Sequence, residues 1–426
     1  MSVSVPAGSA SRRHLLTLPL RHRFLAVLFL VAAVLWLRLG LQAAQIGTVV
    51  LVATVGLWRI ARHRRISPIL AGYLRRQLVY ARQWPWITSR LGLASADGIY
   101  RTRLGKVRST WVADRLWLRL APGQTPETIA AVCEPLRHIL GAERIACAEL
   151  SPGRVLVTVY RRDPLGAPVA PAPLSDPVDL SSIRLGLTES GEPFTLRLAG
   201  SHLLVAGSSG SGKSSLLWGL VRALSPGVRS GTIAIWAIDP KGGIELSAGQ
   251  VLYSGWAENA AGAADLLDDA VVELQTRTAY LRGVARAHVP TPDMPLMVLV
   301  IDELAALVAY CPDATLRKRM IGALHLLLTQ GRAAGIVVIG AVQDPRKESV
   351  PFRDLFTVRV ALRLVEPEAV DLVLGDGARA RGAACDRIPA SLPGVGYVRS
   401  DDRAGLVRVR VAYVSDADIS ALVRAF

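Results

Sequence analysis

The sequence predicts an α/β fold: an open sheet of parallel strands with connecting helices, preceded by a small α+β module and an N-terminal pair of membrane helices. Three observations predict this arrangement. Short apolar runs recur near residues 203, 233, 297 and 336, with segments of helical pattern between them. A glycine-rich loop directly follows the first run, and an acidic pair ends the third. Finally, an apolar stretch near the N-terminus is long enough to enter a membrane.

The membrane stretch runs from Phe24 to Trp58 and carries one charge, Arg38. As a single helix it would be about 52 Å long, whereas the hydrocarbon core of a bilayer is roughly 30 Å thick. Two short helices that turn between Arg38 and Gln45 fit better. Arginines flank the stretch on both sides, which places both flanks in the cytoplasm. We therefore expect residues 1–66 to form a basic tail and a two-helix anchor, and the protein to be a multi-pass protein of the cell membrane with its remaining domains in the cytoplasm.

The net charge of +16 lies wholly in the N-terminal quarter. Residues 1–110 hold 17 Lys and Arg and a single acidic residue, Asp97, whereas the rest of the chain is balanced. This basic excess indicates contact with anionic lipid or with DNA, and the sequence leaves both open. The four cysteines show no CxxC spacing, which argues against a disulfide framework and against a zinc site.

Residues 67–162 predict a basic helical segment, with a turn at Pro85, and then a small α+β module. The stretch "RLWLRLAPG" alternates like a strand, and "RIACAEL" and "RVLVTVYRR" predict two more. Between them, "TPETIAAVCEPLRHILG" predicts a helix that Thr125 caps and Pro126 opens. The module carries no catalytic grouping. Residues 163–180 are rich in proline and predict a linker to a domain over 181–426.

The loop "GSSGSGKSS" matches the pattern G-x-x-x-x-G-K-[ST] and lies between the strand "SHLLVAG" and the helix "SSLLWGLVRAL", the context that the motif requires. Its glycines let backbone N–H groups converge on phosphates at the positive end of a helix. We expect Lys213, exposed in the loop, to neutralise the β- and γ-phosphates of ATP, and Ser214 to bind Mg²⁺. The predicted nucleotide-binding residues are Gly207, Ser208, Ser209, Gly210, Ser211, Gly212, Lys213, Ser214 and Ser215.

The second motif is "PLMVLVIDELAAL", an apolar strand that ends in Asp302 and Glu303. Acidic groups at the carboxyl end of a parallel strand lie where open α/β sheets bind ligands. We expect Asp302 to hold the Mg²⁺ water shell together with Ser214, and Glu303 to polarise the attacking water. The strand "GIVVIGAVQ" ends at Gln343, which is suited to sensing the γ-phosphate. The acidic pair favours hydrolysis by a RecA-like P-loop ATPase over a kinase or a small GTPase.

After a further strand, "TIAIWAID", comes "AIDPKGGIELS". With "VLVIDELAAL", "GRAAGIVVIGAVQDP" and "TVRVALRLVEPEAVDLVLGDGA", it resembles the FtsK/SpoIIIE family of DNA-pumping ATPases over roughly residues 185–426. The resemblance implies a hexameric ring that uses ATP to pull double-stranded DNA through its centre. It also assigns the Walker roles to Lys213, Ser214, Asp302 and Glu303. Its "DPK" is residues 239–241, and its sensor is Gln343.

A ring ATPase needs a positive charge from the neighbouring subunit at the transferring phosphoryl group. Arg332, Arg353 and Arg359 are the candidates, and Arg332 leads, because it matches the family's arginine in "GRAAGI". The family often has arginine after the sensor glutamine, where this chain has Asp344. The charge there is reversed, so the resemblance implies no DNA or inter-subunit contact at this residue. The larger members end in a winged helix that reads DNA sequence. No such pattern follows the last predicted strand here, so we expect no sequence preference from the ATPase domain.

The anchor and middle module resemble those of small actinobacterial members encoded on conjugative or integrated plasmids. The expected function is therefore a membrane-anchored, ATP-driven translocase of double-stranded DNA for conjugative plasmid transfer, with other plasmid-transfer proteins as partners. Three alternatives stay open: a type VII-like protein-secretion ATPase, a chromosome-segregation DNA pump, and a nucleotide-binding membrane scaffold without hydrolysis. DNA-stimulated ATP hydrolysis separates the DNA pumps from the secretion ATPase and the scaffold.

Overall fold

The computed structural model describes residues 73, 75–95, 99–346 and 349–426. The predicted tail and membrane hairpin over residues 1–66 lie outside the described residues. Among the helices that are described, none is both long and apolar enough to cross a bilayer. The chain divides into two compact units, Met1–Arg161 and Arg162–Phe426.

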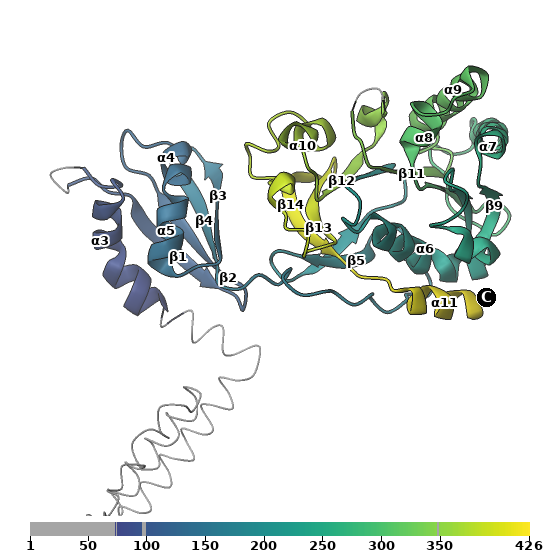
Figure 1. Cartoon of the computed structure of the whole chain (residues 1–426). Helices are drawn as coiled ribbons and strands as arrows, with labels where there is room; N and C mark the ends of the chain where they lie inside the picture. Colours follow the sequence, from purple (N-terminus) through teal and green to yellow (C-terminus); the bar gives the residue numbers. More distant parts are fainter. Residues whose placement is uncertain (1–72, 74, 96–98, 347–348) are drawn as a thin grey trace, which may run out of the picture. The chain divides into compact units, whose positions relative to one another are not determined.

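The first unit is a four-stranded antiparallel sheet with helices on one face (Figure 1). Its strand order is β1-β2-β4-β3, and its core joins Leu116 and Val157 of the sheet to Trp84 and Leu136 of the helices. Its elements are the π-helical segment η2 (Arg76–Ala81), α3 (Arg82–Arg90), β1 (Arg103–Ser109), β2 (Ala113–Arg119), α4 (Pro126–Ala131), α5 (Cys133–Leu140), β3 (Arg144–Ser151) and β4 (Arg154–Tyr160).

Two prolines of this unit behave differently from the sequence prediction. Pro85 does not make a turn; it lies inside α3, and the wider π-helical segment η2 ends at Ala81, the position whose carbonyl the proline ring would otherwise meet. The predicted helix over 125–141 does begin at Pro126 with Thr125 as its cap, but it breaks at Val132. The break follows from Pro135, which has no N–H to donate to the carbonyl four residues earlier.

The second unit holds a ten-stranded sheet of order β6-β5-β14-β13-β12-β7-β11-β10-β8-β9, in which β12, β7, β11, β10, β8 and β9 run parallel. The predicted strands near residues 203, 233, 297 and 336 are all present. The strands are β5 (Ile183–Thr188), β6 (Pro193–Leu196), β7 (Leu203–Ala206), β8 (Ile233–Ile238), β9 (Tyr253–Ala257), β10 (Leu296–Ile301), β11 (Ile336–Val342), β12 (Val358–Leu362), β13 (Val395–Ser400) and β14 (Arg403–Val411).

Helices cover both faces of this sheet, so alternate residues of each central strand enter two different cores. In β10, Met297 and Leu299 pack with α7 to α10, whereas Val298 and Val300 pack with α6 and α11. The helices are α6 (Lys213–Arg229), α7 (Ala260–Leu281), α8 (Leu304–Val308), α9 (Ala314–Gln330), α10 (Pro367–Leu374) and α11 (Asp416–Arg424), with short 3₁₀ turns η3 (Ser247–Leu252), η4 (Arg353–Leu355) and η5 (Cys385–Arg387).

The proline-rich segment over residues 163–180 is held against the rest of the second unit by hydrogen bonds and by burial of one of its side chains. Arg410 and Arg222 donate to the carbonyls of Leu165 and Ala172 at 2.8 and 2.6 Å. The Tyr413 N–H donates to the Val169 carbonyl at 2.8 Å, and Leu165 is fully buried. These contacts fix the path of the segment along β14 and α6.

Candidate nucleotide-binding site

The glycine-rich loop lies at the carboxyl end of β7, where the parallel strands β7, β10, β11 and β8 all end at one edge of the sheet. The loop turns sharply into α6, which begins at Lys213. Gly212, just before it, has φ of 104°, and a Cβ there would lie 2.6 Å from the backbone nitrogen of Gly394. Only glycine fits this position, because both the backbone angle and the close approach exclude a side chain.

Residues far away in the sequence hold the loop in shape. The Ser208 N–H and hydroxyl both donate to the Arg363 carbonyl, at 2.9 and 3.0 Å. The Arg363 guanidinium donates to the Ser209 carbonyl at 2.8 Å, and the Gly394 N–H donates to the Ser211 carbonyl at 2.8 Å. Arg363 and Gly394 carry no motif of their own, so this support could not be recognised from the sequence.

Lys213 is half-buried, not exposed as the sequence predicted. It is the first residue of α6, and its ammonium turns back to donate to the carbonyls of Gly207 at 2.7 Å and Ser208 at 3.2 Å. Burial lowers the pKa of Lys213, and the carboxylates of Glu303 and Asp302 oppose that shift. The loop after β7 and the acidic pair after β10 lie at the same edge of the sheet.

Asp302 and Glu303 follow β10 directly, and each is only 5% exposed. Burial is the main reason that the pKa of Asp302 rises to about 6; Asp239 adds to the shift and Lys241 opposes it. Glu303 Oε2 lies 3.2 Å from the Lys241 ammonium, and Oε1 accepts the Gln343 N–H at 3.3 Å. The acidic pair is therefore buried and lies beside the ammonium of Lys241.

Lys241 owes its place to Asp239, the fully buried residue that follows β8. The Asp239 carboxylate accepts the N–H groups of Lys241 at 3.3 Å, Glu245 at 2.8 Å and Leu246 at 3.0 Å. Three such bonds fold the loop "PKGGIEL" back over the sheet edge. The sequence pointed to residues 239–241 only through the family motif; the structure adds that Asp239 shapes the loop and Lys241 reaches the acidic pair.

Gln343 follows β11 at the same edge, and its exposed side chain is free to approach a ligand there. Asp344, the residue that departs from the family pattern, pairs with Arg346 at 2.9 Å and accepts a hydrogen bond from the Tyr310 hydroxyl at 3.3 Å. The reversed charge at residue 344 is thus balanced locally by an arginine two residues later.

The three candidate arginines have different surroundings. Arg332 is exposed and precedes β11, so it lies at the amino edge of the sheet, about 23 Å along a seven-residue strand from the loop edge. Arg359 is buried and donates to the Phe356 carbonyl and to Asp354, both at 3.1 Å. The Arg359 guanidinium is thus occupied by hydrogen bonds within its own subunit, which argues against Arg359 as the arginine that acts on a neighbouring subunit. Arg353 is half-buried in η4.

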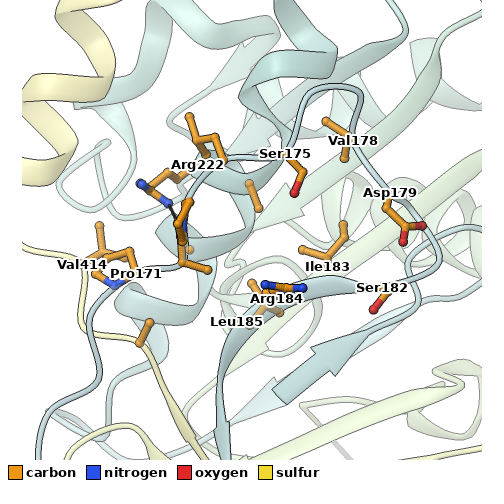
Figure 2. A pocket seen from close by; sticks show the side chains of 16 residues that line it. Pro171, Ser175, Val178, Asp179, Ser182, Ile183, Arg184, Leu185, Arg222 and Val414 are labelled. Atoms are coloured by element: carbon orange, nitrogen blue, oxygen red, sulfur yellow. Dashed lines mark hydrogen bonds between the residues drawn. The ribbon is translucent and has the colours of Figure 1, made fainter. Parts of the chain in front are cut away.

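A separate hollow lies between the proline-rich segment, β5 and α6 (Figure 2). Arg222 projects into it from the middle of α6 and holds the segment through the Ala172 carbonyl. Asp179 on its rim is already engaged by the Ser181 N–H and hydroxyl, at 3.0 and 2.6 Å. The hollow is lined mainly by small and aliphatic side chains, with Arg184 and Asp179 as its other charged residues, so we assign it no chemistry.

Residues 169–385, just over half of the chain, match the model of the FtsK/SpoIIIE family. The chain belongs to the FtsK/SpoIIIE family. Residues 92–161 match a second model, the actinomycete conjugal transfer protein N-terminal domain. The first match covers most of the second compact unit, and the second match covers the C-terminal part of the first.

Several named proteins resemble this member of the FtsK/SpoIIIE family. The transfer protein TraSA of Streptomyces ambofaciens is 28% identical over 359 residues, which cover 78% of this chain and 84% of TraSA. Protein Tra of Streptomyces lividans is 26% identical, over 72% of this chain and 50% of Tra. The DNA translocase FtsK of Staphylococcus aureus is 26% identical, over 57% of this chain and 32% of FtsK. The chain thus spans about half of Tra and a third of FtsK.

Among solved structures, the conjugation coupling protein TcpA of pCW3, with ATPγS, superposes with a TM-score of 0.54 at 19% identity. The match covers 81% of this chain and 98% of TcpA. At this identity the similarity supports the fold alone: a mixed α/β architecture with a large, mostly parallel sheet.

Proposed function

We propose that this FtsK/SpoIIIE member is a RecA-like ATPase that uses ATP hydrolysis to move double-stranded plasmid DNA during conjugative transfer. The observation that carries the proposal is that Lys213 and the buried pair Asp302 and Glu303 lie at one sheet edge, in a chain that also has the actinomycete conjugal transfer domain. Similarity to TraSA over most of both chains favours plasmid transfer as the process.

In this proposal the loop from Gly207 to Ser215 and the start of α6 hold the ATP phosphates. Lys213 exchanges the carbonyls of Gly207 and Ser208 for the β- and γ-phosphates, which are better partners because they carry charge. The exposed side chain of Gln343, at the end of the adjacent strand, contacts the γ-phosphate. The lysine is thus held close to the place where its charge is needed.

The residues present fit a magnesium ion. Asp302 is a desolvated carboxylate with a raised pKa, so its ionised form gains from a cation, and the Ser214 hydroxyl follows Lys213 in the first turn of α6. No cluster of three acidic, histidine or cysteine ligands occurs within the described residues. Mg²⁺ does not need one, because it is held by one or two protein groups, water and the phosphates. When bound, the ion neutralises charge on the phosphates.

Glu303 is the group that would accept a proton from the attacking water or orient it. Its two oxygens are held by the Lys241 ammonium and the Gln343 N–H, so the carboxylate is fixed in direction before ATP arrives. Lys241 must release Oε2, or share it, for that oxygen to meet the water. Loss of Glu303 is then expected to remove hydrolysis while leaving the phosphate contacts.

The ring assembly is part of the proposal. Arg332 lies at the amino edge of the sheet, so it cannot reach the loop of its own chain. A homo-hexamer that brings this edge of one subunit to the nucleotide of the next would supply the missing positive charge. Arg332 is exposed, as such a role requires.

We propose four parts for the chain: a basic tail and two-helix membrane anchor over 1–66, a helical linker and α+β module over 67–162, the proline-rich linker over 163–180, and the motor over 181–426. The anchor would place the motor at the cytoplasmic face of the cell membrane. A reporter fused after residue 66 should then be cytoplasmic, and one inserted near Gly40 should be outside. If both report the same side, the hairpin is wrong.

The decisive experiment is ATP hydrolysis by the purified full chain, kept in detergent, with and without duplex DNA. We expect duplex DNA to stimulate hydrolysis, and Glu303→Gln to abolish the stimulated rate while ATP still binds. Hydrolysis that does not respond to DNA would contradict a DNA translocase. Near-normal turnover in Glu303→Gln would show that another group activates the water.

A further inference from the structure

The outward face of the four-stranded sheet in the first unit is covered by basic side chains. Side chains alternate along each strand, and Leu116, Leu118 and Val155 point into the core beneath the helices. Their neighbours therefore point the other way, and none of the strand residues on this outward face is acidic. The basic residues there are Arg103, Lys106 and Arg108 of β1, Arg115 and Arg119 of β2, Arg144 of β3 and Arg154 of β4.

Three of these arginines form a row across the sheet. Arg103 is the direct cross-strand partner of Arg119, and Arg119 is the direct partner of Arg154. All three are exposed, and none of them makes an ion pair with a residue that the structure describes. Directly opposed side chains lie about 5 Å apart, and like charges in such pairs destabilise a sheet. Arg119 is therefore repelled by an arginine on each side, Arg103 and Arg154.

A second row lies further along the same strands, where Arg108 is the direct partner of Arg115. Arg115 and Arg119 are four residues apart on β2, so the rows are separated by about 13 Å. Trp117 lies between them, and its ring is covered by Lys106 and Arg108, each 5.9 Å from the ring centroid. At the outer end of the first row, a hollow lined by its three arginines and by Gly123 and Gly153 gives the face a concave edge.

We propose that this face binds the phosphate backbones of double-stranded DNA, as a contact separate from the motor unit. The separation of the two rows matches the major groove of B-DNA, which is about 12 Å wide, so each row can face one of the strands that border it. The arginines of the two rows, which form no ion pair with a described residue, would gain phosphate partners, and the repulsion within each row would be relieved. No base-reading group is needed for such contacts, so they would be independent of sequence.

The same charges could attract an anionic membrane, but the face is less suited to one. Binding at a bilayer surface grows with the apolar area that enters it. Here the one large aromatic side chain between the rows, Trp117, is half-buried and already covered by two cations. The inference rests on the proposed DNA substrate but not on ATP hydrolysis, so binding can be measured without turnover.

The test uses the purified full chain in nanodiscs of neutral phosphatidylcholine and measures binding of an arbitrary fluorescent 30-base-pair duplex at several salt concentrations. Replacing the first row, Arg103→Gln with Arg119→Gln and Arg154→Gln, should weaken binding about tenfold near 0.1 M salt and reduce the slope of log K against log salt by about 3. The pair Arg108→Gln and Arg115→Gln should reduce that slope by about 2. Rates of ATP hydrolysis without DNA should stay unchanged.

The matched control removes three charges from the helical side of the same unit, with Arg76→Gln, Arg82→Gln and Arg90→Gln, all exposed. It should keep the wild-type slope. Arg→Lys substitutions in the first row should retain most of the binding, because lysine also binds phosphate, as a point charge. The Gln variant should also fold at least as well as the wild type at low salt, since a repulsion has been removed.

Equal losses in the row variant and the control would overturn the proposal. So would a loss that appears only in nanodiscs containing phosphatidylglycerol, because the row would then contact lipid headgroups. If the wild type itself binds no duplex under any of these conditions, the proposed DNA substrate fails as well. If the wild type binds the duplex and the row variant binds it equally well, the proposed DNA substrate stands and only the role of this face is refuted.

Discussion

The Lys241 ammonium lies 3.2 Å from Glu303 Oε2 and 3.9 Å from Asp302 Oδ2, so a cation from the neighbouring loop rests on both members of the acidic pair. Asp239 is a third carboxylate in the group, since it raises the pKa of Asp302. Lys241 therefore balances a local excess of negative charge when no nucleotide is bound. Its side chain is 40% exposed, so it can move away when another cation takes over that task.

Replacing Lys241 should make the nucleotide-free protein depend on magnesium. Lys241→Ala leaves the carboxylates without their cation, which should cost about 1 kcal/mol of unfolding free energy. Millimolar Mg²⁺ should restore most of that loss, whereas it should change the stability of the wild type much less. Thermal unfolding in EDTA measures the stability lost, and thermal unfolding in Mg²⁺ measures how much of it returns. Lys241→Arg is the control that keeps the charge. An equal Mg²⁺ response in all three proteins would contradict this role.

Lys213→Ala should fold normally but bind ATP at least tenfold more weakly and lose turnover. The variant gives up one half-buried cation and two hydrogen bonds to loop carbonyls, which is a small structural change, but it removes the charge that faces the phosphates. Binding of a fluorescent ATP analogue and thermal unfolding separate the two effects. Lys318→Ala, at an exposed lysine of α9, is the control and should behave like the wild type. Unchanged ATP affinity in Lys213→Ala would remove the loop from the nucleotide site.

The sequence predicted the loop, the acidic pair and the four central strands because each is marked by a local pattern. An apolar run, a following polar residue and a helix-period segment are all visible within about fifteen residues. The parallel arrangement of these strands then brings their carboxyl ends together without further information. Lys213, Asp302 and Gln343 could therefore be assigned to one sheet edge from the sequence, and the structure places them at that edge.

Contacts between distant segments could not be predicted in the same way. The Arg363 carbonyl that holds Ser208 lies 155 residues away in the chain, and nothing around Arg363 marks it. Arg359 was one of three candidate arginines in the sequence, but only the fold reveals that its side chain turns inward to Asp354. The cross-strand row at Arg119 was hidden for a related reason, because strand register depends on pairing and not on the composition of any one strand.

Stability should fall in mild acid because of His202. This histidine is fully buried at the start of β7, its Nδ1 accepts the Val338 N–H at 3.0 Å, and burial together with Arg332 lowers its pKa to about 4. The unfolded chain binds the proton near pH 6.5 and the folded chain only near pH 4, so stability is complete above pH 6.5 and is lost as the pH falls through this window. Between pH 7.5 and 5 the loss should be about 2 kcal/mol.

His202→Asn keeps an acceptor for the Val338 N–H and removes the titrating group. Its unfolding free energy should therefore fall less between pH 7.5 and 5 than that of the wild type, by about the same 2 kcal/mol. Urea unfolding at the two pH values measures the difference. His325→Asn, at an exposed histidine of α9, should lose as much stability in acid as the wild type does. If the unfolding free energies of His202→Asn and the wild type fall equally between pH 7.5 and 5, His202 is not the group responsible.

Arg332 should act on the nucleotide of a neighbouring subunit, which mixing experiments can detect. Arg332→Ala alone should be inactive, and so should Glu303→Gln. In a ring formed from equal amounts of both, about one site in four joins an intact Glu303 to a neighbour's intact Arg332, so ATP hydrolysis should return to a fraction of the wild-type rate. Arg282→Gln, at another exposed arginine of the same sheet edge, should be active alone. If no mixing ratio restores hydrolysis while both variants still assemble, the arginine that completes the site lies elsewhere, and half-buried Arg353 becomes the next candidate.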